Sequence, residues 1–185
     1  MTTDRRTVLA DAAIDVLADA GIRGLTHRAV DRAAGLPSGT TSAYFRTRQA
    51  LLTALVSRLV ALDQAELRAA GAATPAPRTP EDLVAGIAAL TERRLTGEGR
   101  RRSLARYACA LESVRHPELR EILRPRENAG RDLVRAFVAA HGHADAEERT
   151  LTLLTCVDGL VFDRLVSGGA VCAEEIRRLV DTALR

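Results

Sequence analysis

Residues 25–52 read LTHRAVDRAAGLPSGTTSAYFRTRQALL, and their pattern predicts a short helix that ends in a tight turn. Thr26 carries a hydroxyl that can accept from the free N–H groups at the start of a helix. Leu25 before this cap and Val30 four residues after it are spaced as a hydrophobic staple, which fixes how the chain enters the helix. Gly35 can adopt the left-handed conformation that ends a helix.

A second short helix is predicted over Gly39–Phe45, because Pro37 prevents the first helix from continuing and Ser38 is placed as a new N-cap. Two short helices joined by a turn of three to four residues have the spacing of a helix-turn-helix, whose second helix enters the major groove of DNA. An ordinary helical hairpin is the plain alternative. The cap, the staple, the turn length and a second helix rich in small hydroxyl groups together favour DNA binding.

Several side chains of this stretch are candidates for contact with DNA. Arg28 lies two residues past the cap and can donate two hydrogen bonds to guanine, although a solvated helix face is the alternative. Tyr44 is a candidate for a phosphate contact, whereas Phe45 is expected in the core. Arg48, at the start of the next helix, is expected to meet phosphate. The full set is Thr26, His27, Arg28, Ser38, Gly39, Thr40, Thr41, Ser42, Tyr44, Arg46 and Arg48.

A family resemblance rests on Thr26, Ala34-Gly35, Gly39-Thr40, Tyr44-Phe45, and Arg48 followed by Ala50-Leu51-Leu52. In these residues the chain resembles the TetR family of transcriptional regulators over roughly residues 5–55. Two positions depart from the family pattern: Ser42 stands where the family usually has tyrosine, and Arg48 stands where it usually has lysine, which keeps the charge. The resemblance implies a repressor that binds a palindromic DNA operator as a homodimer and releases it on binding a small apolar or amphipathic effector.

The composition favours an all-α protein. Of the 185 residues, 46% are apolar, largely Ala, Leu and Val, and only 3% are aromatic, which suits helices packed through aliphatic side chains. The net charge of +3, from 27 basic and 24 acidic residues, permits nucleic-acid binding without requiring it. Three separated cysteines without a CxxC motif suit a reducing cytoplasm. No apolar run approaches the length of a membrane span.

About nine helices are expected. Besides the two described, the pattern predicts helices over residues 4–20, 48–70, 81–96, 101–115, 117–140, 146–167 and 173–184. The proline-rich stretch 71–80 is the clearest loop. We expect two domains: residues 1–47 bind DNA, and residues 48–185 form a helical domain for effector binding and dimerisation, with the helix at 48–70 as the lever between them.

The resemblance also implies functional residues in the second domain. The helices between residues 81 and 140 resemble the ligand-binding core of the family, and we expect Tyr107, Leu111 and Phe137 among the walls of an effector cavity. The helix at 146–167 is so apolar that it needs cover on more than one side. The last two helices resemble the dimerisation face of the family, with Leu154, Asp158, Gly159, Phe162, Ile176 and Leu179 as expected interface residues.

Other functional readings carry less support. His141, His143 and Asp145 have a spacing compatible with metal binding, but two imidazoles and one carboxylate in a loop are too few, and no metal or cofactor is expected. The basic run 100–102 is better read as a solvated helix start than as a second nucleic-acid patch. No nucleophile-elbow, phosphate-loop or zinc-protease motif occurs, which leaves a small helical enzyme as a remote alternative. An activator or architectural dimer that needs no effector is the closer one.

Overall fold

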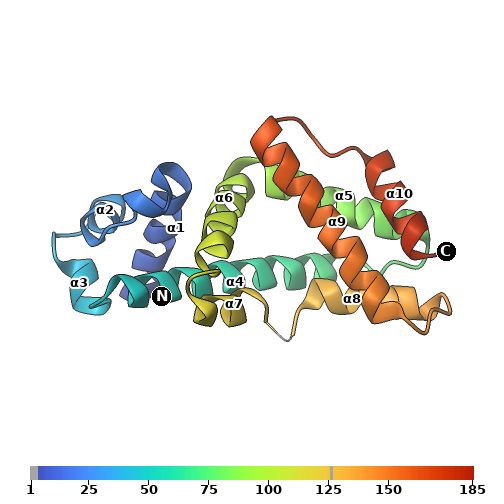
Figure 1. The fold of residues 1–185 in the computed structure, drawn as a ribbon, viewed down its shortest axis with the longest axis horizontal. Helices are drawn as coiled ribbons and strands as arrows, with labels where there is room; N and C mark the ends of the chain where they lie inside the picture. The colour runs from blue at the N-terminus through green and yellow to red at the C-terminus, as the bar shows by residue number, and fades with distance from the viewer. Residues whose placement is uncertain (1–3, 126) are drawn as a thin grey trace. The chain divides into compact units, whose positions relative to one another are not determined.

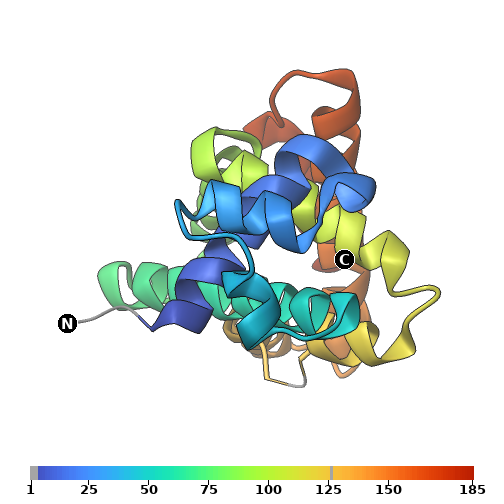
Figure 2. The same cartoon turned by 90° about the vertical axis from the view of Figure 1, so that its left-hand side faces the viewer.

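The computed structural model describes residues 4–125 and 127–185, which form ten α-helices and no strand (Figures 1 and 2). The predicted all-α fold is thus confirmed. The helices are α1 Arg5–Gly24, α2 His27–Ala33, α3 Thr40–Tyr44, α4 Arg48–Ala73, α5 Pro80–Leu95, α6 Gly97–Glu112, α7 Pro117–Leu123, α8 Ala129–Ala140, α9 Ala146–Ser167 and α10 Ala173–Ala183.

The tenth helix arises because the expected helix over 117–140 is two helices. Arg124 lies outside the helical region at φ −117° and ψ 68°. The residue before a proline is pushed away from the α conformation, which accounts for the end of α7 next to Pro125. Asn128 then starts α8, since its side chain accepts a hydrogen bond from the backbone N–H of Arg131 at 3.0 Å.

The chain divides into two compact units, and two of the three boundaries between them fall within helices, in α4 and in α6. The first unit contains the chain up to Asp63 together with Arg101–Pro125, and the second contains Gln64–Arg100 and the chain from residue 126 onward. These units follow packing, and both α4 and α6 contribute to each of them. The functional boundary expected between residues 47 and 48 is a different division and stays a prediction.

The core of the second unit is built by α5, α8, α9 and α10. Helix α10 packs on α5 and α9, and α9 also packs on α8 and α5. The buried side chains include Val138, Ile176 and Val180, all fully covered. Thr150 also lies in this interior, and its hydroxyl has no hydrogen-bond partner among the described residues. An unpaired buried hydroxyl costs free energy, so this position is a weak point of the unit.

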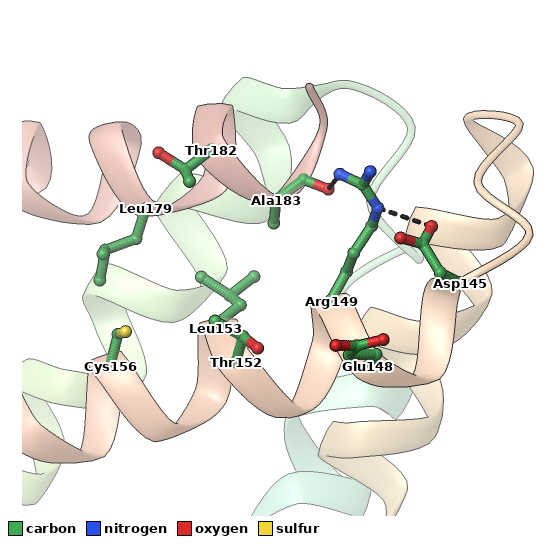
Figure 3. Close-up of a pocket in the computed structure, with 9 residues that line it drawn as sticks. All are labelled: Asp145, Glu148, Arg149, Thr152, Leu153, Cys156, Leu179, Thr182 and Ala183. Carbon is green, nitrogen blue, oxygen red and sulfur yellow. Dashed lines mark hydrogen bonds and ion pairs between the residues drawn. The ribbon is translucent and has the colours of Figure 1, made fainter.

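A hollow of about 210 Å³ lies between α9 and α10 (Figure 3). Its apolar floor contains Leu153 and Leu179, and at one end Arg149 donates to the Asp145 carboxylate at 2.7 Å and to the carbonyl of Ala183 at 3.1 Å. The bond from Arg149 lowers the pKa of Asp145. The lining residues are Asp145, Glu148, Arg149, Thr152, Leu153, Cys156, Leu179, Thr182 and Ala183.

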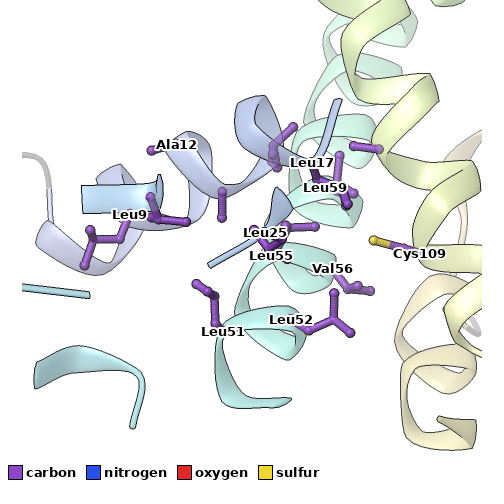
Figure 4. Packing of buried hydrophobic residues seen from close by; sticks show 14 of the residues in the cluster. Leu9, Ala12, Leu17, Leu25, Leu51, Leu52, Leu55, Val56, Leu59 and Cys109 are labelled. Carbon is purple, nitrogen blue, oxygen red and sulfur yellow. The ribbon is translucent and has the colours of Figure 1, made fainter. Parts of the chain in front are cut away.

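The core of the first unit is formed by side chains of α1, α4 and α6 and of residues 25–45. Figure 4 shows Leu17, Leu25, Leu55 and Leu59 in the interior, and all four are at most 2% exposed. Full burial of one such side chain is worth about 1.5–3 kcal/mol, so this cluster dominates the stability of the unit. Cys109 lies in the same cluster, and burial raises the pKa of its thiol to about 12, which leaves it an unreactive apolar side chain.

Ion pairs add a polar layer to the first unit. Asp11, Asp15 and Asp19 lie one turn apart on α1. Arg58 of α4 donates to Asp11 at 2.6 and 3.1 Å. Arg101 of α6 donates to both oxygens of Asp19 at 2.8 and 2.9 Å and to Asp15 at 3.3 Å. The bonds to Asp19 raise the pKa of the Arg101 guanidinium. The middle arginine of the basic run 100–102 is therefore structural.

Candidate nucleic-acid interface

The predicted start and end of α2 are confirmed. The hydroxyl of Thr26 accepts a hydrogen bond from the backbone N–H of Ala29 at 3.2 Å, and the staple residues Leu25 and Val30 are both fully buried. Gly35 adopts the left-handed conformation at φ +64°, which only glycine reaches without strain. The chain therefore enters and leaves α2 where the sequence pattern predicts.

The predicted cap of α3 is wrong. Ser38 is exposed and makes no capping bond, and the N-cap position is taken by Gly39, which has a left-handed φ of +94° and no side chain to cap with. The hydroxyl of Thr40 donates to the carbonyl of Pro37 at 2.6 Å and is likewise used within the turn. The free N–H groups at the start of α3 are satisfied from another helix.

That partner is Asp31 of α2, a buried carboxylate that sequence reasoning missed. It accepts from the backbone N–H of Gly39 at 2.8 Å, and from the backbone N–H and the hydroxyl of Thr41 at 2.7 and 2.5 Å. Burial by itself raises the pKa of Asp31, but the hydrogen bonds from Thr41 and Gly39 outweigh it and hold the pKa below its ordinary value. The position of Asp31 directly after the buried staple residue Val30 was the one sequence feature that could have indicated a buried carboxylate.

Thr41 does not belong to the DNA-contacting surface. It is fully buried, and its hydroxyl donates to Asp31, so it cannot reach a base edge. The three consecutive hydroxyl residues Thr40, Thr41 and Ser42 gave no indication of which one faces inward. Ser42 and Tyr44 are exposed, the latter at 38%, and they form the outward side of this helix.

Two further candidates are occupied within the chain. The ring nitrogen Nε2 of His27 lies 2.7 Å from the carbonyl oxygen of Phe45, and because a carbonyl only accepts, Nε2 carries the hydrogen. The guanidinium of Arg48 donates to the carbonyl oxygens of Ile22 and Leu25. Arg48 therefore ties the start of α4 to the end of α1, and because its side chain is exposed as well, its phosphate contact stays a prediction.

The remaining candidates lie on the surface around α3. Arg28 of α2 is exposed, as is Arg46, and Phe45 is buried as predicted. The guanidinium carbon of Arg6 stands 5.9 Å from the ring centre of Tyr44 and 5.3 Å from that of Phe45, which is cation–π geometry. Arg6 thus places a positive charge beside Tyr44 on the exposed side of α3, an arrangement suited to a polyanion.

Comparison with known proteins agrees with this geometry. Residues 78–185 match the profile of the tetracyclin repressor-like C-terminal domain, and residues 9–55 match that of the bacterial regulatory proteins of the tetR family. The chain belongs to the TetR family. This TetR-family protein is therefore a DNA-binding transcriptional regulator and not an enzyme.

Solved structures with the same fold extend over nearly the whole chain. A transcriptional regulator from Rhodococcus sp. Rha1 is 26% identical, with a TM-score of 0.75 over 98% of this chain and 94% of that one. A TetR-family member from Streptomyces coelicolor A3 is 27% identical, with a TM-score of 0.73 over 97% and 98%. The multidrug-binding protein EbrR in complex with ethidium is 27% identical, with a TM-score of 0.73 over 99% of both chains. No curated protein sequence matches the chain.

The expected effector-cavity residues are not brought together around the hollow of Figure 3. Leu111 is 69% exposed, so it is not the wall of an internal cavity in this structure, and that expectation is wrong. Phe137 is buried in the core of the second unit, where its ring centre lies 4.2 Å from that of His141. Tyr107 is half-buried and belongs to the first unit. The resemblance to the ligand-binding core that suggested all three could not distinguish a cavity wall from a core or a surface position.

The expected dimerisation residues separate into exposed and buried groups. Gly159 and Phe162 are exposed on α9, the latter at 48%. Leu154 and Leu179 are half-buried, and Asp158 accepts a hydrogen bond from Arg94 at 2.8 Å. Ile176 is fully buried in the core of the second unit, so it cannot contact a partner, and its assignment to the interface is wrong. Sequence reasoning also missed Leu151 and Val166, which are 48% and 73% exposed on the same helix as Phe162.

The histidines of the loop between α8 and α9 are engaged with backbone. Nδ1 of His141 lies 2.8 Å from the carbonyl oxygen of Phe137, and Nε2 of His143 lies 3.2 Å from that of Leu184. Within residues 4–125 and 127–185, no group of three or more potential ligands is arranged for a metal ion. No helix in this part of the chain has the length and apolar character needed to cross a membrane.

Proposed function

We propose that the chain is a repressor that binds a palindromic operator as a homodimer, with α3 of each protomer in the major groove. The supporting observation is the outward side of α3, where Ser42 and Tyr44 are exposed, together with the exposed arginines Arg28 of α2 and Arg46 just after α3. Arginine is the side chain that most often reads guanine in the major groove, and hydroxyl groups contact bases or phosphates.

The second part of the proposal is dimerisation through α9. Leu151, Phe162 and Val166 are separated by eleven and four residues, which places them on one side of a helix. Gly159 lies on the same side, where the absence of a side chain permits close approach of another helix. A long helix that buries one apolar side in its own unit and exposes a second apolar side is suited to pair with its symmetry mate.

The third part is release by a small organic effector, supported by the likeness to EbrR, which has been crystallised with ethidium and with malachite green. The effector stabilises a dimer whose two α3 helices no longer match successive major grooves, which lie about 34–36 Å apart. Each tenfold loss of operator affinity requires the effector to discriminate between the two dimer states by about 1.4 kcal/mol.

An effector-independent regulator is the alternative, and the size of the hollow between α9 and α10 favours it. That hollow measures about 210 Å³. Pockets that enclose drug-sized ligands are larger, about 300–1,000 Å³. On this alternative the chain binds its operator constitutively, as an activator or an architectural dimer.

Selection of tight-binding duplexes from a random pool tests the proposal. We expect an inverted repeat bound by two chains, with half-sites one turn of DNA apart. Failure to enrich any sequence, or enrichment of a single half-site bound by one chain, would contradict it. Addition of malachite green to the operator complex then separates the alternatives: an effector-controlled repressor loses at least tenfold in affinity. An effector-independent regulator loses none, with dye binding to free duplex measured as the control.

A further inference from the structure

The recognition helix α3 is too short to hold its own shape. It contains five residues, Thr40–Tyr44, whereas isolated helices below about 12–15 residues are marginal in water. Its conformation and its direction must therefore come from contacts with neighbouring elements. Two residues of α2, His27 and Asp31, supply polar contacts at opposite ends of α3, and they lie four residues apart, on the same side of α2.

At the N-terminal end, the carboxylate of Asp31 satisfies two of the free backbone N–H groups of α3, those of Gly39 and Thr41. It also accepts from the hydroxyl of Thr41, so three donors converge on one buried side chain that is 3% exposed. A negative charge at this end of a helix is favoured by the helix dipole. These directional bonds fix both the position and the rotation of the first turn.

At the C-terminal end, Nε2–H of His27 donates to the carbonyl oxygen of Phe45 at 2.7 Å. Phe45 is the C-cap residue of α3, and such carbonyl groups have no partner inside the helix. The side chain of Phe45 is 3% exposed, so the bonded end is also anchored in the core. Helix α3 is therefore held at both ends by side chains from one face of α2.

We propose that His27 and Asp31 are positioning residues for operator recognition, which set the orientation of α3 and so decide how Ser42 and Tyr44 meet the bases. This inference rests on the proposed function. Neither residue has to contact DNA: Asp31 is buried, and Nε2 of His27 is already used. His27, which the sequence predicted as a DNA contact, would thus act within the unit by holding the end of α3.

The inference distinguishes specific from non-specific binding. Non-specific affinity comes mainly from basic side chains near phosphate, such as Arg46, which lies outside α3. Specific affinity requires side chains of α3 at defined places in the groove. Loss of the polar contacts should disorder or rotate α3 while the apolar core around Leu25 and Val30 keeps the unit folded.

The test compares Asp31→Asn and His27→Ala with the wild-type chain on the selected operator and on a scrambled duplex. Asp31→Asn removes the charge at nearly constant shape, and His27→Gln keeps a side-chain donor and should rescue much of the loss in His27→Ala. Hydrogen bonds to charged groups of this kind predict a loss of about 10- to 100-fold on the operator for Asp31→Asn. Affinity for the scrambled duplex should change less than about twofold. Asp19→Asn is the matched control, because it also removes a hydrogen-bonded carboxylate of this unit without touching α3.

Hydrogen exchange on the full chain without DNA gives a second measurement that does not depend on finding an operator. The amides of Gly39, Thr41 and Phe45 should exchange at least tenfold faster in Asp31→Asn, whereas the amides of α1 keep their wild-type rates. Unchanged exchange in α3 would overturn the inference even if DNA binding is confirmed. Equal loss of affinity for operator and scrambled duplex, together with faster exchange throughout the unit, would also overturn it, since it would show a purely structural role. Failure of the wild-type chain to select any duplex would contradict the proposed function and overturn the recognition role.

Discussion

Helices α3 and α9 are stabilised in opposite ways. Helix α3 has five residues and is held by directional polar contacts from α2, chiefly those of Asp31. Helix α9 has 22 residues and is held by a buried apolar side, while Phe162 and Val166 remain exposed on another side. Hydrogen bonds define an orientation closely but add little net free energy, whereas apolar burial adds much free energy with little directional preference. The difference suits the proposed roles of the two helices, sequence recognition for α3 and dimerisation for α9.

The largest expected effect breaks the apolar side of this comparison. Gly159→Arg should convert the dimer to monomer and abolish operator binding, because a charge would be buried in the proposed interface. A Cβ at Gly159 would meet no atom within 4 Å in the chain, so the monomer should fold normally. Sedimentation at micromolar concentration should give about twice the 19.9 kDa chain mass for the wild type and the single-chain mass for the variant.

Glu92→Arg, on the exposed surface of α5, is the control for Gly159→Arg and should remain dimeric. A wild-type chain that is monomeric and still binds a palindrome tightly would contradict dimerisation through α9.

The next effect concerns the support of α3 rather than its surface. Arg48→Ala should lower the free energy of unfolding by about 1.5–3 kcal/mol, because two charged hydrogen bonds to the carbonyls of Ile22 and Leu25 are lost. Urea denaturation measures this change. Lysine cannot bond two carbonyls through a planar fork, so the free energy of unfolding of Arg48→Lys should lie between those of the wild type and Arg48→Ala. If the Arg48→Ala chain is fully stable and its DNA binding depends less steeply on salt, the result would support the predicted phosphate contact of Arg48.

Arg28→Ala tests whether Arg28 contributes to sequence recognition. If Arg28 reads guanine, its removal should cost about 1–3 kcal/mol per half-site on the operator and barely change non-specific binding. Titrations of operator and scrambled duplex at several salt concentrations measure both quantities. Equal losses on both duplexes would make Arg28 a phosphate contact and leave base reading to Ser42 and Tyr44.

The charge of Asp31 makes its stabilising contacts with α3 depend on pH. Its pKa is lowered in the folded chain, since the bonds from Thr41 and Gly39 outweigh the opposing effect of burial. Such a group stabilises the fold above its unfolded pKa of about 3.9, and the stabilisation is lost as the pH falls through the folded pKa. The difference in free energy of unfolding between wild type and Asp31→Asn should therefore be constant from about pH 7 to about pH 5, and it should shrink below about pH 4. Denaturation curves across this pH range measure the difference. A difference that grew as the pH fell would contradict the prediction.

The smallest expected effect is a gain on the apolar side. Thr150→Val replaces a fully buried hydroxyl that has no partner by a methyl group of similar size, and it should raise the free energy of unfolding by about 1 kcal/mol. Thr152→Val, at an exposed position of the same helix, is the control and should change it by less than about 0.5 kcal/mol. A loss of stability in Thr150→Val would mean that the hydroxyl is hydrogen-bonded after all.

Much of the local structure was predictable because it depends on neighbouring residues. The cap at Thr26, the staple of Leu25 and Val30, and the left-handed Gly35 are properties of a few consecutive positions, and all three were found as predicted. The all-helical fold follows from the spacing of apolar residues, which the sequence displays directly. The division next to Pro125 was not predicted, because the apolar spacing over 117–140 continues across the proline.

The sequence by itself determined that this is a helical DNA-binding regulator and where its helix-turn-helix lies. Only the tertiary structure decided which of the polar candidate side chains form hydrogen bonds within the unit and which remain exposed. Arg48 and Thr41 were read as contacts by their chemistry, yet Arg48 bonds the carbonyls of Ile22 and Leu25, and Thr41 bonds Asp31. The physical reason is that an arginine or a hydroxyl donates equally well to a phosphate, a carbonyl or a buried carboxylate, and the choice depends on residues far away in the chain.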